Sequence, residues 1–134
     1  MKIVYYTSGI TGSGRVVTGI AIGNAFRRNG MDKEFTILSS SPFARLADGF
    51  NHIEIPAEDE NALSPENYPS SELFKKLKEL APDVMIVDLL WFPIHHFSKE
   101  LPCKKLLICR YVHEKFFSIP LPGGRLDFDP SRFD

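Results

Sequence analysis

The chain has 134 residues, a length that suits one domain with one buried core. Its hydrophobic content of 43% and charged content of 25% are those of a globular protein, which argues against a disordered or fibrous chain. A formal net charge of -1 gives no general attraction for a polyanion, so no nucleic-acid partner is expected.

Two cysteines, Cys103 and Cys109, flank a short apolar run and do not suggest a disulfide framework. The amino terminus enters a strand-like run at Lys2 without the long apolar segment and small-residue cleavage site of a signal peptide. No apolar run approaches the roughly 20 residues that span a bilayer. We therefore predict a cytoplasmic protein that is not transmembrane, and a peripheral position at the membrane is compatible with this.

Five short apolar runs have the character of strands covered on both faces, because most of them are continuous and do not alternate. They span residues 2–6, 34–38, 52–55, 84–89 and 105–109. Between them, helical periodicity occurs over residues 16–29 and 71–80. A shorter helix is expected at 42–47, and another is expected after Pro93.

Strands that alternate with helices predict right-handed crossovers and a parallel sheet. We predict an α/β fold, a Rossmann-like open parallel sheet of about five strands in the order 3-2-1-4-5 with helices on both faces. Residues 1–118 are expected to form this domain. Residues 119–134 contain no periodic segment, and we expect there a connecting tail that leads to a carboxy-terminal domain.

A glycine-rich loop from Ser8 to Gly14 follows the first predicted strand. It lies at the carboxyl end of that strand, beside the point where strand order reverses and where open α/β sheets bind ligands. The N–H groups and positive dipole end of the following helix favour an anionic group there. Gly12, Ser13, Gly14 and Arg15 are accordingly candidate substrate-binding residues. The alternative is a tight turn that binds nothing.

Two nucleotide-binding motifs fail in this loop. Gly9 and Gly14 have the spacing of a P-loop, but Arg15-Val16 stands where a lysine and a serine or threonine would hold phosphate and magnesium. A dinucleotide-binding loop needs a third glycine where Val17 stands, and an acidic residue after the second strand, where the chain has three serines. These departures argue against a P-loop protein and against an NAD enzyme, and no cofactor is expected.

The first strand, the run Gly12-Ser13-Gly14-Arg15-Val16 and a helix that ends at Gly30 resemble the amino-terminal half of GT-B glycosyltransferases. The likeness is greatest to the MurG-like branch, whose first loop typically reads Gly-x-Gly-His, and it covers most of the chain in strand and helix order. The resemblance implies that this domain binds the acceptor. It also implies that a nucleotide sugar, the co-substrate, is bound mainly by a carboxy-terminal domain.

The chain departs from that family at one position that affects the mechanism. Arg15 stands where the resemblance places the histidine that acts as a base or lies beside the reacting groups. Arginine stays protonated and cannot take a proton from an acceptor hydroxyl. Its planar guanidinium can still bind a phosphate or an acceptor carboxylate. A solvated side chain in the first helical turn is the alternative.

The fourth predicted strand delivers further candidates to the same edge of the sheet. Asp88 is expected to accept a proton or to orient a histidine, and His95 or His96 is a candidate general base with an ordinary pKa near 6.5. The alternative for Asp88 is a helix cap. Adjacent histidines on a helix point in different directions, so the two cannot both face one site.

Other residues beyond these strands carry weaker signals. Arg110 follows the fifth strand and is a candidate for binding an anionic acceptor group, the alternative being an exposed charge at a strand end. His95, His96 and His113 have no metal-binding spacing, so no metal is expected. Trp91-Phe92 and Phe116-Phe117 can form an apolar wall for a lipid-linked or aromatic acceptor, or can belong to the core.

The leading hypothesis is the acceptor-side domain of a glycosyltransferase that transfers a sugar from a nucleotide sugar to an acceptor hydroxyl. Its partner is a carboxy-terminal GT-B domain, in cis or as a separate subunit in trans, and the isolated chain is expected to be inactive. The alternative is a stand-alone Rossmann-like module that binds a small anion or nucleotide without catalysis. The donor sugar, the acceptor, the stereochemical outcome and the oligomeric state are not determined by the sequence.

Overall fold

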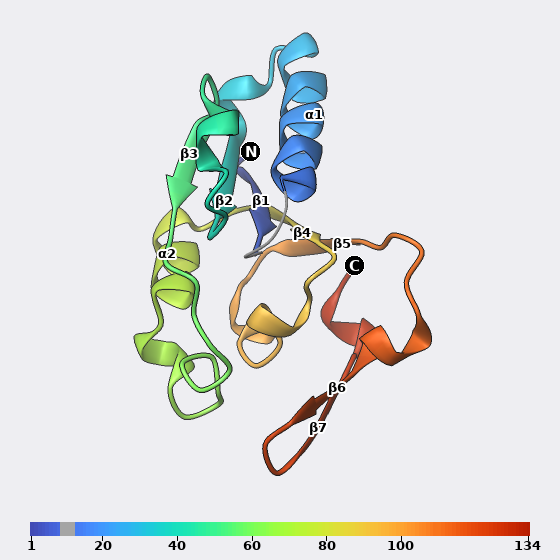
Figure 1. Cartoon of the computed structure of the whole chain (residues 1–134). Helices are drawn as coiled ribbons and strands as arrows, with labels where there is room; N and C mark the ends of the chain where they lie inside the picture. The colour runs from blue at the N-terminus through green and yellow to red at the C-terminus, as the bar shows by residue number, and fades with distance from the viewer. Residues whose placement is uncertain (9–12) are drawn as a thin grey trace.

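The computed structural model describes residues 1–8 and 13–134, and Figure 1 shows its α/β arrangement. Five parallel strands form one sheet in the order β3-β2-β1-β4-β5. They are β1 (Ile3–Thr7), β2 (Phe35–Ser39), β3 (Asn51–Glu54), β4 (Val84–Asp88) and β5 (Lys104–Ile108). The predicted fold class and strand order are confirmed, and each predicted strand lies within one residue of the observed one.

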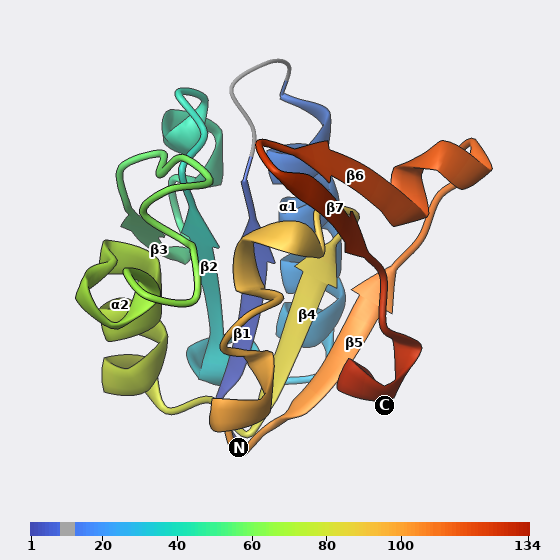
Figure 2. The ribbon, with the colours of Figure 1, turned by 90° about the horizontal axis from the view of Figure 1, so that it is seen from below.

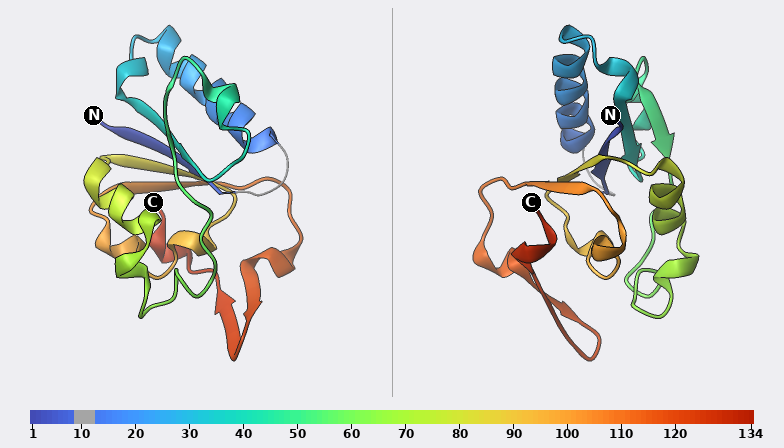
Figure 3. Two further views of the ribbon diagram at one scale, coloured as in Figure 1. Left: turned by 60° about the vertical axis from the view of Figure 1, so that its left-hand side comes forward. Right: turned by 180° about the vertical axis from the view of Figure 1, so that it is seen from behind.

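Two α-helices cover opposite faces of the sheet (Figures 2 and 3). Helix α1 (Gly14–Arg28) packs closely because glycines face the strands. A Cβ atom at Gly19 would lie 2.6 Å from the Tyr5 ring, and one at Gly23 would lie 2.5 Å from the Phe50 ring. Larger side chains at these two positions would therefore push the helix off the sheet.

Helix α2 (Glu72–Leu80) covers the other face and has defined ends. The Ser71 side chain accepts a hydrogen bond from the backbone N–H of Phe74, as an N-cap does. Ala81 ends the helix in the left-handed conformation, with φ 44. Leu73 and Leu77 are buried against the sheet, as the helical periodicity of this segment predicts.

The two other predicted helices are replaced by short 3-10 turns. The segment predicted at 42–47 forms a turn at Ala44–Ala47, and the segment after Pro93 forms turns at Phe92–Ile94 and Ser98–Glu100. A continuous helix would use the His95 carbonyl for a backbone bond, but Arg132 Nη1 and the Ser98 hydroxyl donate to it at 2.6 and 3.2 Å. Further 3-10 turns occur at Asp32–Glu34, Tyr68–Ser70, Glu114–Phe117 and Pro130–Arg132.

The last residues form an antiparallel hairpin of β6 (Ser118–Leu121) and β7 (Gly124–Asp127), which projects from the rest of the fold in Figure 3. The chain then returns to the edge of β5, where the Asp134 N–H donates to the Lys105 carbonyl at 2.8 Å. Sequence periodicity did not predict this hairpin, because its strands have only four residues each. The expected connection to a carboxy-terminal domain stays a prediction.

Neighbouring residues of each strand face opposite sides of the sheet, and this divides the core in two. Tyr5 belongs to the cluster under α1, with Val16 and Phe35, whereas Tyr6 belongs to the cluster under α2, with Leu77. Within the described residues, no helix combines the length and the apolar character that crossing a membrane requires.

Candidate functional site

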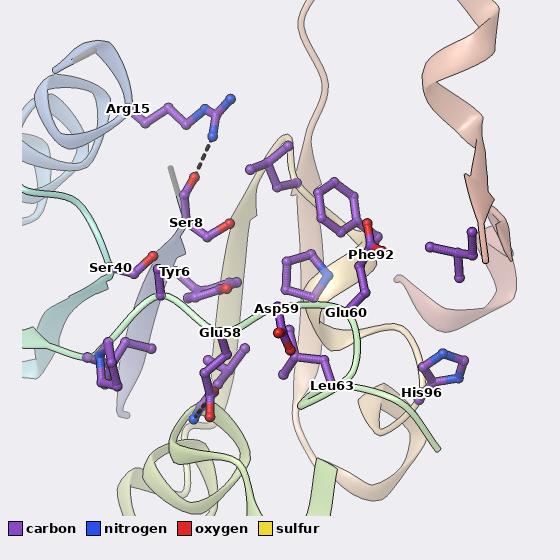
Figure 4. A pocket seen from close by; sticks show the side chains of 17 residues that line it. Tyr6, Ser8, Arg15, Ser40, Glu58, Asp59, Glu60, Leu63, Phe92 and His96 are labelled. Carbon is purple, nitrogen blue, oxygen red and sulfur yellow. Dashed lines mark hydrogen bonds between the residues drawn. The ribbon is translucent and has the colours of Figure 1, made fainter. Parts of the chain in front are cut away.

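A pocket of about 520 Å³ lies at the carboxyl edge of the sheet, where the segments after β1, β2, β3 and β4 meet (Figure 4). It is on the α2 side, since Tyr6, Leu63 and Leu73 contribute both to it and to the core on that side. Its volume is that of an ordinary small-molecule site. The lining residues are Tyr6, Ser8, Arg15, Ser40, Ile55, Pro56, Ala57, Glu58, Asp59, Glu60, Leu63, Leu73, Leu90, Phe92, Pro93, His96 and Leu121.

Polar groups lie on more than one side of this pocket. Figure 4 shows Arg15, Ser8 and Ser40 on one side, while His96 lies on the opposite side. The Arg15 guanidinium donates to the Ser8 carbonyl, which holds the cation over the end of β1. Burial raises the pKa of Tyr6, so its hydroxyl stays protonated at neutral pH and is able to donate a hydrogen bond.

The acidic loop between Pro56 and Pro69 forms one wall of the pocket. Glu58 is engaged at the start of α2, where its carboxylate accepts from the N–H groups of Glu72 and Leu73 at 2.7 and 3.0 Å. The loop is therefore fixed by a helix N-terminus, and Glu58 acts as a cap. Sequence reasoning did not identify this wall, because the contact joins residues 14 and 15 positions apart.

The two adjacent histidines occupy different environments. His96 lines the pocket, and burial, with a smaller effect of the Arg132 guanidinium, lowers its pKa below 6.5. It is therefore neutral at pH 7 and able to accept a proton. The His95 ring packs against Trp91 with centroids 5.6 Å apart, and burial lowers its pKa to about 4. Only His96 of the pair belongs to the pocket lining.

Asp88 lies on the other face of the sheet, under α1, and its side chain is fully buried. The Tyr5 hydroxyl donates to its Oδ2 at 2.5 Å and also lies 2.7 Å from the Arg15 carbonyl oxygen. Burial, and next the Asp88 carboxylate, raise the pKa of Tyr5. The structure thus separates Asp88 from His95 and His96, and it ties the end of β4 to the start of α1.

Arg110 joins the same buried cluster from the segment after β5. Its Nη2 donates to Thr18 Oγ1 at 2.7 Å and to Asp88 Oδ2 at 3.3 Å, while its side chain is 46% exposed. The Oδ1 atom of Asp88 has no hydrogen-bond partner among the described residues. Arg110 therefore compensates part of a buried charge, and it lies outside the pocket lining.

The loop residues predicted to bind substrate are placed only in part. Gly12 lies outside the described residues. Ser13 precedes α1 and its side chain makes no capping hydrogen bond, while a Cβ atom at Gly14 would meet nothing within 4 Å. The first turn of α1 contains no acidic residue, so its positive end is not neutralised there. Arg15 is the loop candidate that reaches the pocket.

Of the predicted aromatic wall, Trp91 is buried in the core, whereas Phe92, Phe116 and Phe117 are partly exposed. Trp91 is 1% exposed, its Nε1 donates to the Phe116 carbonyl at 3.2 Å, and its ring packs against Phe128. Of the four aromatic residues proposed for the wall, Phe92 is the one that lines the pocket. Across residues 1–8 and 13–134, no three His, Cys, Asp or Glu side chains gather as metal ligands would.

Comparisons of the chain with protein-family models, with curated proteins and with solved structures found no match. The functional argument therefore depends on the fold and on the pocket.

The lowered pKa of His95 predicts a loss of stability in acid. The folded pKa of about 4 lies below the 6.5 of an unperturbed histidine, so the unfolded chain takes up a proton first as the pH falls. The contribution of His95 to the free energy of unfolding is constant above pH 6.5 and decreases as the pH falls from 6.5 to 4. Because His95 is only half-buried, we expect about 1–2 kcal/mol after solvent screening.

The measurement is urea unfolding of the wild type and of His95→Gln at pH 7 and pH 4. Between pH 7 and pH 4, the free energy of unfolding should fall by about 1–2 kcal/mol more in the wild type than in His95→Gln. His52 and His96, which also have lowered pKa values, are present in both proteins and cancel in the comparison. An equal fall in the two proteins would contradict the assignment.

Proposed function

We propose that this chain is the acceptor-side domain of a GT-B glycosyltransferase, which transfers a sugar from a nucleotide sugar to an acceptor hydroxyl. The observation that carries the proposal is the pocket at the carboxyl edge of the sheet, beside the reversal of strand order between β1 and β4. A lining that combines apolar residues such as Leu63, Leu73 and Phe92 with polar residues around them suits a hydroxyl-bearing acceptor that has an apolar part.

Within this proposal four of the pocket residues have definable tasks. Arg15 provides a fixed positive charge beside the transferred group or an acidic acceptor substituent. Ser8 and Ser40 supply short hydroxyl groups that hydrogen-bond to the acceptor. His96, neutral at pH 7, accepts the proton of the acceptor hydroxyl as its oxygen attacks the anomeric carbon of the donor. The bond between the anomeric carbon and the phosphate oxygen breaks, and the nucleoside diphosphate departs on the donor side.

A complete catalyst needs a donor-binding domain, in cis or as a partner subunit. That domain would bind the nucleotide sugar opposite the pocket and close the site against water. Asp88 is a positioning residue in this scheme, because it is buried on the α1 face and fixes Tyr5 and the first turn of α1.

A second candidate is a module that binds a small anion or nucleotide without catalysis. It is favoured by the start of α1, where the first turn has no acidic residue and Ser13 makes no capping hydrogen bond with its side chain. The two candidates predict different ligands for this chain. An acceptor-side domain binds acceptor analogues in the pocket, whereas the module binds free nucleotides or phosphate at the helix.

The test is a thermal-shift panel of alkyl and aryl glycosides, nucleotides, nucleotide sugars and inorganic phosphate. A pocket ligand at about ten times its Kd should stabilise the chain by about 1.4 kcal/mol, which raises Tm by about 3–6 °C. We expect such shifts from glycosides and not from free nucleotides. Tight binding of a nucleotide or of phosphate would instead support the second candidate.

Two tryptophan variants locate the binding. Ala57 is an exposed residue of the pocket wall, so Ala57→Trp should fill the pocket and abolish the glycoside shift without unfolding the chain. Ala21 is an exposed residue of α1 outside the pocket, and Ala21→Trp should leave the shift unchanged. A shift that survives in Ala57→Trp would place the ligand elsewhere and refute the acceptor pocket.

A further inference from the structure

The loop between Pro56 and Pro69, which forms one wall of the pocket, contains no lysine, arginine or histidine. Its acidic residues are Glu58, Asp59, Glu60 and Glu66. The first three line the pocket, and Figure 4 shows them along the loop, between Tyr6 and His96 in that view. Of the ion pairs among the described residues, none involves this loop. Its negative charge is therefore not neutralised by a described side chain.

The positive groups near the pocket do not offset this charge. Among the described lining residues one cation, Arg15, stands against three carboxylates, and with His96 neutral the lining has a formal charge of -2. The Arg15 guanidinium is held by the Ser8 carbonyl and not by the acidic loop. Arg132, whose charge acts on His96, lies outside the lining and is paired with Asp129 at 3.2 Å. The pocket as a whole is therefore negative.

The three carboxylates differ in how far they are engaged. Glu58 accepts from two N–H groups at the start of α2, as described above. Asp59 Oδ1 accepts from the Ala62 N–H at 2.8 Å, which holds the loop in place, and the Asp59 side chain is exposed. Glu60 is exposed and lines the pocket. Asp59 and Glu60 are thus the carboxylates that a ligand in the pocket can reach.

The floor of the pocket carries a buried polar group beside this wall. Tyr6 is 2% exposed and lines the pocket, and Figure 4 shows its side chain between Ser8 and Glu58 in that view. Burial is the main cause of the raised pKa of Tyr6, and the Glu58 carboxylate raises it further. The negative potential of the loop therefore extends to the floor, since the low-dielectric walls of a pocket focus such a field.

We infer that the acceptor bound in this pocket carries a protonated amine, which lies against the acidic loop within reach of Asp59 and Glu60. The inference rests on the acceptor function proposed above. An ammonium group has three donors and no acceptor, so it is suited to carboxylate oxygens and to the oxygen of the Tyr6 hydroxyl. Charge-assisted hydrogen bonds favour it over a neutral hydroxyl group, and the same carboxylates repel an anionic substituent.

A divalent metal ion is a poorer occupant of this wall. Over residues 1–8 and 13–134, no three His, Cys, Asp or Glu side chains converge as metal ligands would, although three carboxylates follow one another along the loop. An ammonium needs only one or two such oxygens. Because Asp59 and Glu60 are exposed, water and salt screen their charge, and the expected preference for an amine is about three- to tenfold.

The test starts from the glycoside that gives the largest shift in the thermal panel. Three derivatives of its aglycone, 2-aminoethyl, 2-hydroxyethyl and carboxymethyl, are titrated calorimetrically into the whole chain at neutral pH. The aminoethyl glycoside should bind about three- to tenfold more tightly than the hydroxyethyl glycoside, and the carboxymethyl glycoside should bind most weakly. Raising NaCl from about 50 to about 500 mM should reduce the amine preference to less than about twofold.

The Asp59→Asn/Glu60→Gln double variant should lose the amine preference and keep its affinity for the hydroxyethyl glycoside. Asparagine retains an oxygen for the Ala62 N–H, and thermal unfolding shows whether the variant is folded. Glu114→Gln, which removes an exposed carboxylate outside the pocket, is the matched control and should keep the preference. Equal affinity for the amine and the hydroxyl, or an amine preference that survives in the double variant, would overturn the inference and leave the acceptor pocket standing. Failure of every glycoside to bind would refute the acceptor pocket and the inference together.

Discussion

Tyr5→Phe is expected to lower the free energy of unfolding by about 2–3 kcal/mol, a large effect for the loss of one oxygen atom. The hydroxyl donates at 2.5 Å to the fully buried Asp88 carboxylate, whose Oδ1 has no partner among the described residues. Without Tyr5, the partially exposed Arg110 at 3.3 Å is left as the compensating group. Hydrogen bonds to charged groups cost the most to remove, because an uncompensated carboxylate stays buried.

Tyr6→Phe is the matched control for this prediction. It removes the same atom from the next residue of β1, where the neighbouring side-chain hydroxyl is the neutral Ser8. We expect a cost of about 0.5–1.5 kcal/mol, measured like the first by urea unfolding. In the Asp88→Asn background the cost of Tyr5→Phe should fall by about 1 kcal/mol or more. Equal costs for the two tyrosines, or no coupling to Asp88, would show that the cluster contributes little.

The strand order was predictable from the sequence for a physical reason. Continuous apolar runs indicate strands with both faces covered, and right-handed crossovers leave few arrangements of such strands. The close approach of α1 was also foreseeable from its glycines, since Gly19 and Gly23 face the rings of Tyr5 and Phe50. Local pattern and tertiary packing agree in these segments.

The edge of the sheet that forms the pocket was predictable, whereas the side of the sheet that each residue faces was not. Asp88 ends a strand with no polar alternation, so the sequence does not show which face receives its carboxylate. The structure places it on the α1 face, opposite the pocket. The same ambiguity applied to Tyr5 and Tyr6, which are adjacent, equally apolar in context and separated by the sheet.

Contacts between distant segments determined the features that the sequence did not predict. The His95 carbonyl accepts a hydrogen bond from Arg132, 37 residues away, and this divides an expected helix into two turns. Glu58 caps α2 across the acidic loop and turns that loop into a pocket wall. Neither contact has a local sequence signature, so periodicity and turn chemistry alone do not reveal them.

In the complete transferase that we propose, His96→Gln should lower kcat by about a hundredfold or more, in the range of general-base catalysis. Glutamine keeps much of the size and a hydrogen-bonding group but cannot accept a proton at neutral pH. The acceptor KM should change little, because the apolar pocket residues and Arg15 remain. The measurement is initial-rate kinetics against acceptor concentration, with this chain joined to or mixed with its donor-binding partner.

His95→Gln is the natural control, since His95 is the adjacent residue and does not line the pocket. It should leave kcat within a few-fold of the wild type. The acid limb of the rate profile provides an independent check. A base whose pKa is lowered below 6.5 stays active to lower pH than an unperturbed histidine, so the wild-type rate should decline only below pH 6.5. Asp88 lies across the sheet from the pocket and cannot replace His96 as the base. Loss of activity in His95→Gln but not in His96→Gln would therefore show that the base does not lie in this pocket.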